Sequence, residues 1–322
     1  MHDLLVTENI TGPSMDALRR SLDVVFEPEL WKKPDELRQR IKEFKGLMVR
    51  NQTRVDASLL EAGVHLHIVG RAGVGLDNVE VKAATDRGIV VCYTPEQNSL
   101  SVAELTIALM LSLARKITPA DASAKSGKWE RQKFTGSELF GKRLGLIGMG
   151  RIGFLTATRA CAFGMEILGY DPQLTTDSLA VIESDAQLVD LDELLQLSDF
   201  VSIHVPETPQ TMGLMNQSRF SRMKSTAFLI NTSRGGVVDE AALVQALRDG
   251  KIAGAALDVR MKEPPITGPL ESMENVILLP HIGAFTEEGQ SRVVQCVCRD
   301  VAAVLRGEKA RSYVNYPMPR RG

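Results

Sequence analysis

An apolar run that leads directly into a glycine-rich turn is the sequence feature that most constrains the fold of this chain. The run covers residues 144–147, and the turn carries Gly148, Gly150 and Gly153 before a helical pattern that ends near residue 163. A strand, a tight turn and a helix in this order form the first part of a βαβ unit, whose two strands are parallel. The chain is therefore expected to contain an α/β domain, with this turn at the carboxyl end of a strand.

Short apolar runs rich in β-branched residues alternate with amphipathic helical patterns along almost the whole chain, in two blocks. The first block has candidate strands at 4–6, 24–26, 46–49, 67–69 and 89–92, with helical patterns at 34–44 and 79–87. The second block has six candidate strands, at 144–147, 167–170, 200–204, 227–231, 255–259 and 276–279. Such alternation is typical of doubly wound parallel sheets, and six strands match the two βαβαβ halves of a dinucleotide-binding sheet.

A last helical pattern, at 287–305, begins after the second sheet is complete and can return to cover the first block. The chain would then cross twice between its domains. We predict that residues 1–97 and 287–322 form a flavodoxin-like substrate domain, into which residues 98–286 insert as a Rossmann-type NAD-binding domain. Both domains are expected to be α/β structures with doubly wound parallel sheets.

The overall charge argues against several classes of partner. Lys and Arg number 38 and Asp and Glu number 40, so no basic excess indicates a nucleic acid or an anionic membrane surface. The longest apolar run, near 105–114, is shorter than the ~18–20 residues of a membrane span, and residues 1–11 lack the pattern of a secretory signal. Four cysteines without zinc-like spacing indicate neither a disulfide framework nor a metal site. We expect a cytoplasmic protein with a small anionic substrate.

The helical pattern at 101–116 is apolar around more of its circumference than a surface helix requires. Packing of one side on its own domain and of the other side on a second subunit would explain this composition. Complete burial of the helix within one chain is the alternative.

The glycine turn and the strand pattern after it predict the cofactor. Gly148 permits a tight turn, Gly150 lets the backbone approach a pyrophosphate, and Gly153 lets the helix pack closely on the strand. The next strand pattern ends at Asp171, about 20 residues on, where a carboxylate accepts a hydrogen bond from a ribose 2′-hydroxyl. The same charge would repel a 2′-phosphate, so NAD is favoured over NADP. A turn residue before Pro172 is the alternative reading of Asp171.

Three polar residues follow successive strands of the second block. Arg234 follows the strand at 227–231, Glu263 that at 255–259, and His281 that at 276–279. The carboxyl ends of parallel strands meet at one edge, so these side chains are expected beside the cofactor. Oxidation of a hydroxy acid needs a base for the hydroxyl proton, a cation for the carboxylate and a group that orients the base. His281, Arg234 and Glu263 are the candidates for these tasks, and the prediction rests on the three together, since each alone has an ordinary explanation.

These segments resemble the D-2-hydroxyacid dehydrogenase family, and within it the phosphoglycerate dehydrogenases, over nearly the whole chain. Further motifs that carry the resemblance lie at 70–78, 94–104, 127–131 and 204–206. The resemblance implies two similar domains that close on a cleft, NAD as cofactor, and a homodimer formed through the nucleotide-binding domains, with pairing into a tetramer left open. The sequence ends soon after residue 316, so the C-terminal serine-sensing domain of some relatives is not expected.

The resemblance also implies roles for individual residues. Arg234 would bind the substrate carboxylate and carbonyl oxygen, His281 would act as acid and base, and Glu263 would support it. Asp258 would contact the nicotinamide carboxamide. The implied cofactor-binding residues are Gly148, Gly150, Arg151, Ile152, Gly153, Asp171, His204, Pro206, Thr208, Thr232, Asp258, His281 and Gly283. The implied substrate-binding residues are Arg50, Arg71, Val74, Gly75, Asn98, Arg131 and Arg234.

The substrate is less constrained than the reaction. A phosphorylated or sulfonated substrate needs a second cationic site, for which Arg50, Arg71 and Arg131 are available, with salt bridges at the domain edge as the alternative for each. The sequence departs from the family pattern at Glu96, Gln97, Arg260, Met261 and Phe285.

We expect hydride transfer between NAD and C2 of a small D-2-hydroxy acid, with 3-phosphoglycerate as the leading substrate. The alternatives are hydroxypyruvate or glyoxylate reduction, sulfolactate oxidation, formate or phosphite chemistry, and a non-catalytic NAD(H)-sensing corepressor.

Overall fold

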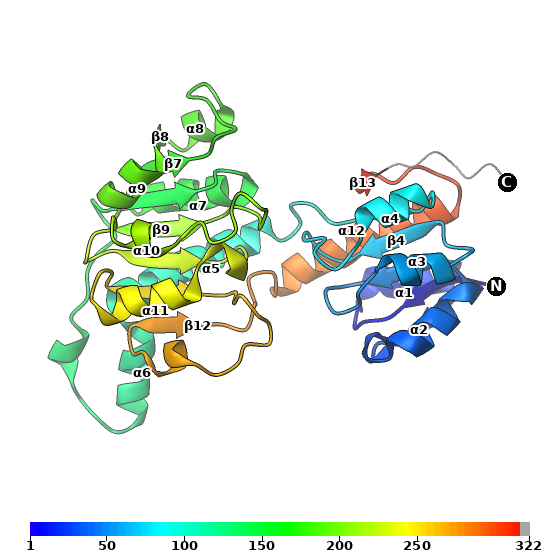
Figure 1. Ribbon diagram of the computed structural model, residues 1–322, viewed down its shortest axis with the longest axis horizontal. Helices are drawn as coiled ribbons and strands as arrows, with labels where there is room; N and C mark the ends of the chain where they lie inside the picture. Colours follow the sequence, from blue (N-terminus) through cyan, green and yellow to red (C-terminus); the bar gives the residue numbers. More distant parts are fainter. Residues whose placement is uncertain (316–322) are drawn as a thin grey trace. The chain divides into compact units, whose positions relative to one another are not determined.

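The computed structural model describes residues 1–315 and divides the chain into two compact units (Figure 1). The first unit comprises Met1–Asn98 together with the chain from Phe285 onward, and the second comprises Ser99–Ala284. The sequence analysis expects these boundaries at 97/98 and 286/287. The end of the predicted substrate domain, residues 316–322, lies outside the described residues.

The first unit is built on a mostly parallel sheet. Its strands are β1 (His2–Val6), β2 (Val24–Phe26), β3 (Phe44–Val49), β4 (Ile68–Arg71), β5 (Val90–Cys92) and β13 (Tyr313–Asn315). The parallel strands follow the order β2-β1-β3-β4-β5, which is the flavodoxin-like order and confirms the predicted fold of this part. The sequence analysis missed β13, a three-residue strand that adds antiparallel to β5 at the edge of the sheet.

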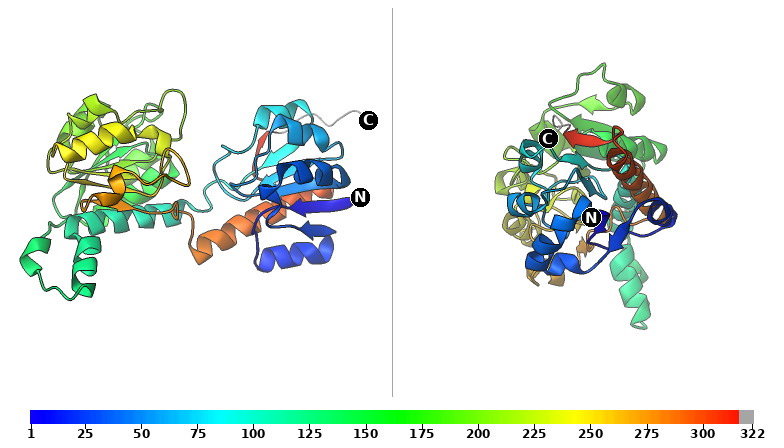
Figure 2. Two further views of the ribbon diagram at one scale, coloured as in Figure 1. Left: turned by 60° about the horizontal axis from the view of Figure 1, so that its bottom comes forward. Right: turned by 90° about the vertical axis from the view of Figure 1, so that its right-hand side faces the viewer.

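Helices cover both faces of this sheet. They are α1 (Pro13–Ser21), α2 (Pro34–Arg40), α3 (Ala57–Ala62), α4 (Val81–Asp86) and α12 (Glu287–Leu305), with short 3-10 turns η1 (Leu30–Lys32) and η2 (Ile41–Glu43). Successive residues of a strand point to opposite faces, so Leu4 packs with α1 and α12 while Leu5 packs with α2, α3 and α4. Figure 2 shows α12 lying along the sheet of this unit.

Two details of this unit differ from or sharpen the prediction. The helix expected at 34–44 ends at Arg40, because Phe44 opens β3, pairs with His2 and is fully buried. The helix expected at 287–305 is observed with those bounds, and it approaches β4 so closely that a Cβ on Gly70 would lie 2.4 Å from Val301. Helix α12 therefore packs on the sheet of the first unit.

The second unit is built on a fully parallel sheet. Its strands are β6 (Arg143–Ile147), β7 (Glu166–Tyr170), β8 (Gln187–Leu188), β9 (Phe200–Ile203), β10 (Phe228–Asn231), β11 (Gly254–Leu257) and β12 (Val276–Leu278). Their order is β8-β7-β6-β9-β10-β11-β12, a Rossmann-type arrangement with its switch point between β6 and β9. The predicted count of six strands was wrong, because the two-residue β8 is too short to leave a periodic pattern.

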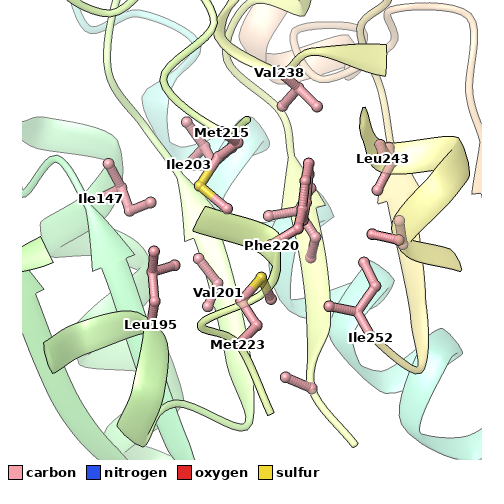
Figure 3. Packing of buried hydrophobic residues seen from close by; sticks show 14 of the residues in the cluster. Ile147, Leu195, Val201, Ile203, Met215, Phe220, Met223, Val238, Leu243 and Ile252 are labelled. Atoms are coloured by element: carbon pink, nitrogen blue, oxygen red, sulfur yellow. The ribbon is translucent and has the colours of Figure 1, made fainter. Parts of the chain in front are cut away.

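The helices of the second unit form a layer on each face of the sheet. They are α5 (Ser99–Arg115), α6 (Ile117–Lys125), α7 (Arg151–Ala162), α8 (Leu179–Glu183), α9 (Leu191–Leu197), α10 (Gln217–Phe220) and α11 (Glu240–Arg248), with 3-10 turns η3 (Arg131–Phe134), η4 (Gly235–Val237) and η5 (Pro269–Ser272). Helices α5 and α7 pack together on one face. On the other face, α9, α10 and α11 enclose a core around Val201, Phe220 and Leu243 (Figure 3).

Helix α5 is not fully buried within the chain, so that alternative was wrong. Leu109 and Met110 face the core, whereas Leu100 and Ala108 are exposed and Leu111 is half-buried. Helix α6 projects from the second unit (Figures 1 and 2). Within residues 1–315, no helix combines the length and apolar character that a membrane crossing requires.

Candidate active site

The glycine turn lies between β6 and α7, and its three glycines are required for different reasons. Gly148 has φ 93°, and a Cβ there would come within 3.0 Å of the His204 carbonyl carbon. A Cβ on Gly153 would lie 2.2 Å from the Gly148 carbonyl oxygen. A Cβ on Gly150 would meet no protein atom within 4 Å. The packing of the protein therefore explains two glycines, while Gly150 leaves open space at the start of a helix.

The N-terminus of α7 presents the expected features of a pyrophosphate cradle. Gly150 is the N-cap residue, and no side chain caps the first turn, which includes Arg151 and Ile152. Backbone N–H groups at such a position carry the positive end of the helix dipole and bind anions. These features fit the diphosphate of a dinucleotide.

Asp171 follows β7 and is held beside the glycine turn. Its Oδ2 accepts a hydrogen bond from the Met149 N–H at 3.0 Å, and its Oδ1 accepts one from the Gln173 N–H at 3.0 Å. The carboxylate is thereby fixed next to the glycine turn. A residue that only formed a turn before Pro172 would not need the hydrogen bond to Met149.

The segment after β9 supports the glycine turn from behind. The His204 N–H donates to the Ile147 carbonyl at 2.8 Å, and the His204 Nε2 lies 3.0 Å from the Ser202 hydroxyl. Burial lowers the pKa of His204 to about 4, so its ring is neutral at pH 7. Pro206 and Thr208 lie in the turn that follows, where the Thr211 hydroxyl donates to the Pro206 carbonyl at 2.6 Å.

Arg234 lies in a tightly bonded turn after β10. The Asn231 Oδ1 accepts hydrogen bonds from the N–H and the hydroxyl of Ser233, and its Nδ2 donates to the Arg234 carbonyl at 2.9 Å. Thr232 is buried and meets the Thr106 hydroxyl of α5 at 3.1 Å. The sequence analysis did not include Asn231; an asparagine at the end of a strand is the signal that would have indicated this turn.

Glu263 and His281 are in direct contact. The His281 Nδ1 lies 2.7 Å from the Glu263 Oε2, and the His281 and Glu263 side chains are 43% and 36% exposed, respectively. Burial raises the pKa of the Glu263 carboxyl, but hydrogen bonds from His281 and the Arg260 N–H, together with the nearby Arg234 charge, hold the pKa below its ordinary value. The structure thus brings together the three residues that follow β10, β11 and β12. Because Nδ1 is engaged with Glu263, Nε2 is the ring nitrogen that can exchange a proton with a ligand.

Asp258 fixes the backbone that carries His281. Its side chain is almost fully buried, and its two oxygens accept hydrogen bonds from the N–H groups of Ile282 at 2.7 Å and Gly283 at 2.8 Å. The Asp258 carbonyl also accepts the His281 N–H at 2.8 Å. His281 has φ 56°, a left-handed conformation that costs on the order of 1–3 kcal/mol and persists where surrounding bonds hold it.

Arg50, one of the predicted anion-binding residues of the first unit, lies in a loop whose backbone is held by hydrogen bonds to a buried acid. The buried carboxylate of Glu8 accepts the N–H groups of Arg50, Gln52 and Thr53 at 2.7, 3.0 and 2.9 Å. The Arg50 guanidinium lies 5.1 Å from the centre of the Phe285 ring. Burial lowers the pKa of Arg50, so an anion would offset part of the cost of its desolvation. Glu8 was missed by the sequence analysis, since an acid after a strand does not by itself indicate which amides it binds.

The loop after β4 carries Arg71, Val74 and Gly75. A Cβ on Gly73 would overlap the Arg71 side chain, so this arginine lies across the loop backbone. Asn98 ends the first unit, and its Oδ1 is buried without a hydrogen-bond partner among the described residues. Arg131 belongs to the second unit, where it opens η3. The predicted substrate-binding residues are thus distributed over both units.

Metal binding has no structural support in the part of the chain that is described. Residues 1–315 contain no cluster of three or more His, Cys, Asp or Glu side chains that could hold a metal ion. All four cysteines are free thiols; Cys92, Cys296 and Cys298 are buried and Cys161 is half-buried.

Comparison with known proteins places these residues in a family context. Residues 107–283 match the model of the NAD-binding domain of D-isomer specific 2-hydroxyacid dehydrogenases. The chain is 45% identical to the D-3-phosphoglycerate dehydrogenases of Archaeoglobus fulgidus and Methanocaldococcus jannaschii, in each case over 98% of its length. It spans only 59% and 60% of the length of those relatives.

Solved structures show the same fold over 97% of the chain. The TT0316 protein from Thermus thermophilus has a TM-score of 0.91 and 36% identity, covering 97% of this chain and 100% of that one. A glyoxylate reductase from Paecilomyes thermophila has a TM-score of 0.87 and 28% identity, covering 97% of this chain and 98% of that one.

Proposed function

Because the chain belongs to the D-isomer specific 2-hydroxyacid dehydrogenase family, whose NAD-binding domain it carries over residues 107–283, we propose that it catalyses reversible hydride transfer between C2 of a small D-2-hydroxy acid and NAD. The observation that carries the proposal is the 2.7 Å contact between His281 and Glu263, near Arg234, in the unit that holds the glycine turn. An acid/base, its supporting carboxylate and a substrate cation are what this reaction requires.

His281 is the proposed acid and base. In the oxidation direction its Nε2 accepts the proton of the C2 hydroxyl, and the C2–H bond breaks with its electron pair as C2=O forms. NAD, when bound, would supply the nicotinamide carbon that accepts this hydride. In reduction His281 returns the proton to the carbonyl oxygen. Glu263 would stabilise the protonated ring through Nδ1 and keep Nε2 turned toward the substrate.

Arg234 is the proposed partner of the substrate carboxylate. Its planar guanidinium can donate two parallel hydrogen bonds to a carboxylate, which a lysine cannot do. The same cation would polarise the carbonyl oxygen as negative charge develops there during reduction. The Asn231 bonds that fix the Arg234 backbone support this role by limiting the freedom of the side chain's attachment point.

The residues around the glycine turn would hold the cofactor. Gly148, Gly150, Arg151, Ile152 and Gly153 would provide the pyrophosphate cradle, whose fit is supported by the open space at Gly150. Asp171 would accept the ribose hydroxyls. Asp258 would contact the carboxamide with lone pairs not used by the Ile282 and Gly283 amides. The further members proposed for this set are His204, Pro206, Thr208, Thr232, His281 and Gly283.

For the substrate we propose 3-phosphoglycerate. Its phosphate calls for a second cationic group, and Arg50, Arg71 and Arg131 are the proposed cations, with Val74, Gly75 and Asn98 contributing polar contacts. The name of the two archaeal relatives supports this choice. Likeness to a glyoxylate reductase supports glyoxylate or hydroxypyruvate as the second candidate substrate, one that needs no phosphate site. In this proposal the first unit is the substrate domain.

The test is a spectrophotometric assay of NAD reduction or NADH oxidation by the purified protein with a panel of acids. The panel contains 3-phosphoglycerate, D-lactate, D-glycerate and sulfolactate for oxidation, and hydroxypyruvate, glyoxylate and phosphohydroxypyruvate for reduction. We expect turnover with D-2-hydroxy acids and the highest kcat/KM with the phosphorylated pair. Absence of turnover with every acid would refute the proposed 2-hydroxyacid dehydrogenase activity, and a preference for glyoxylate would refute the phosphoglycerate assignment alone.

A homodimer is proposed on the basis of α5. The helix leaves Leu100 and Ala108 exposed, and the aromatic side chain of Phe140 in the same unit is 76% exposed. A second copy packed on this side would bury these apolar groups. Sedimentation analysis should give the mass of a dimer or of a larger even-numbered assembly, and a monomer across the micromolar range would contradict the proposal.

A further inference from the structure

Arg260 makes the most extensive set of ion pairs near the candidate active site, and no role has yet been assigned to it. Its Nε and Nη2 donate to the two carboxylate oxygens of Glu240, at 3.1 and 3.0 Å, and its Nη1 donates to Glu271 Oε1 at 2.7 Å. The Arg260 side chain is only 9% exposed. A fork held between two carboxylates and shielded from water gives a strong, directional contact.

The backbone around Arg260 is fixed by the same two acids. The Met261 N–H donates to Glu240 Oε1 at 2.7 Å, and the Gly268 N–H donates to Glu271 Oε2 at 2.8 Å. Gly235 packs directly on this backbone, since a Cβ there would lie 2.0 Å from the Arg260 carbonyl carbon. Arg260 therefore ties its loop to the start of α11, to η5 and to the turn after Arg234.

Besides its contact with His281, Glu263 accepts a hydrogen bond from the Arg260 backbone. The Arg260 N–H donates to Glu263 Oε1 at 3.1 Å, while Glu263 Oε2 faces His281 Nδ1 at 2.7 Å. One carboxylate is thus held at both oxygens, one by the Arg260 backbone and one by the imidazole. A displacement of residue 260 would turn the Glu263 carboxylate away from His281.

Beyond Val259, which is buried, the loop between β11 and η5 has little apolar packing to hold it. Residues 258–268 contain no helix or strand, and Met261 and Ile266 are exposed. A segment with few buried apolar contacts opens locally at low free-energy cost unless other contacts hold it. The ion pairs of Arg260 are the contacts that replace a hydrophobic anchor here.

We propose that Arg260 is a positioning residue for the reaction: its ion pairs with Glu240 and Glu271 hold the loop so that Glu263 stays hydrogen-bonded to His281. The inference rests on the proposed function. Arg260 itself touches neither substrate nor cofactor in this role, and it acts only through Glu263.

Protonation equilibria give this role a distinct signature. Hydrogen bonds to Glu240 raise the pKa of Arg260, and the bond from Arg260 lowers the pKa of Glu271, so the ion pairs persist through neutral pH. The groups that lower the pKa of Glu263 against its burial are His281, the Arg260 N–H and Arg234. If the loop moves, the Glu263 carboxylate no longer stabilises the protonated His281 ring, so the basic form that oxidation needs persists to lower pH. The acid limb of the kcat/KM profile for oxidation then moves to lower pH.

The experiment compares Arg260→Met, Arg260→Lys, Glu263→Gln and the double variant Arg260→Met/Glu263→Gln in the full-length protein. Arg222→Met is the matched control, because it removes an arginine paired with Asp192 at 3.0 Å in the same unit. We expect Arg260→Met to lower kcat/KM about 10- to 100-fold, as loss of a positioning contact does, with little change in the Kd of NADH. Arg260→Lys keeps the charge between Glu240 and Glu271 without the fork, so it should fold even if Arg260→Met does not, and it should recover part of the activity.

The double variant shows whether the loss of Arg260 lowers activity through the position of Glu263 or through a general loss of protein stability. If Arg260 acts through Glu263, Arg260→Met should cost less than about twofold in kcat/KM when Glu263 is already Gln. The acid limb of the Arg260→Met and Arg260→Lys profiles for oxidation should move to lower pH, and the profile of Arg222→Met should match that of the wild type.

Three results would overturn the inference. They are an equal loss in the Glu263→Gln background, an unshifted acid limb, and full activity of both Arg260 variants. A wild-type protein without turnover would refute the proposed function, and the inference with it. An active wild type with any of the three results refutes the inference alone.

Discussion

The glycine turn allows one substitution to test cofactor binding separately from folding. In Gly150→Ala, the added methyl group meets no protein atom within 4 Å, and the φ of −64° at this position is accessible to alanine. Alanine is a poorer N-cap than glycine, whereas the loss of glycine flexibility in the unfolded chain works in the opposite direction. The variant should therefore fold with nearly the stability of the wild type.

The expected changes in stability and in NADH affinity follow from the space around Gly150 and around Gly153. The two opposing effects on Gly150→Ala leave a stability change within about 1 kcal/mol, which is a shift in Tm of about 2–4 °C or less for a unit of this size. The methyl group would occupy the space proposed for the pyrophosphate. Overpacking of about 1–3 kcal/mol corresponds to a loss in NADH affinity of roughly 5- to 150-fold.

Gly153→Ala is the matched control. Its Cβ would lie 2.2 Å from the Gly148 carbonyl oxygen, where ordinary contact begins near 3.4 Å, so helix α7 must move by about 1 Å against the strand. The stability should fall by about 1–3 kcal/mol or more, with a Tm several degrees lower.

Thermal denaturation and a fluorescence titration with NADH measure the two effects independently. The reasoning predicts a separation: Gly150→Ala keeps its Tm and loses NADH affinity, while Gly153→Ala loses Tm first. If Gly150→Ala binds NADH like the wild type, the open space at this position is not the pyrophosphate site. If it lowers Tm as much as Gly153→Ala, the description of the turn is wrong.

Three further outcomes are expected. His281→Gln should lower kcat/KM by about 10²- to 10⁴-fold, because proton transfer is lost, with a much smaller change in the Kd for NADH, because the glycine turn is intact; retention of near-full activity would exclude His281 as the acid/base. Asp258→Asn should lower both Tm and activity, because an amide nitrogen replaces one of two oxygens that accept the Ile282 and Gly283 amides; a variant with normal Tm and normal activity would contradict this role. His204 should contribute to acid sensitivity: its folded pKa of about 4 lies below the ordinary value of 6.5, so the unfolded chain binds the extra proton and stability falls as pH drops from 6.5 to 4. This contribution amounts to at most about 3 kcal/mol. Urea unfolding of wild type and His204→Gln across that range should show a flatter pH dependence for the variant, and parallel curves would contradict the lowered pKa.

Local sequence patterns were sufficient for most of the architecture. A strand that runs into Gly148 and a helix that follows are adjacent in the chain, so their periodicities can be read without any distant contact. The βαβ order then restricts the strand arrangement, and both predicted sheet types were observed. The strands β8 and β13 escaped detection because two or three residues leave no measurable period, and their pairing depends on neighbours in the sheet.

The candidate catalytic residues could be predicted from the sequence for a related reason. Arg234, Glu263 and His281 each follow a strand of one parallel sheet, so topology alone brings them to one edge. Topology does not say which of them touch. That Glu263 contacts His281 at one oxygen and the Arg260 backbone at the other depends on the path of an irregular loop, for which no sequence period exists.

The fold class, the two sheets, the glycine turn and the residue types near it could be predicted from the chain alone, because they depend on the order and spacing of neighbouring residues. The hydrogen-bond partners of the carboxylates became known only from the folded structure. Glu8 orders the loop of Arg50, Asp258 holds the left-handed backbone of His281, and Glu240 accepts hydrogen bonds from Arg260. The partner of a carboxylate is the donor that the folded chain places within about 3 Å of it, and that distance joins segments far apart in sequence.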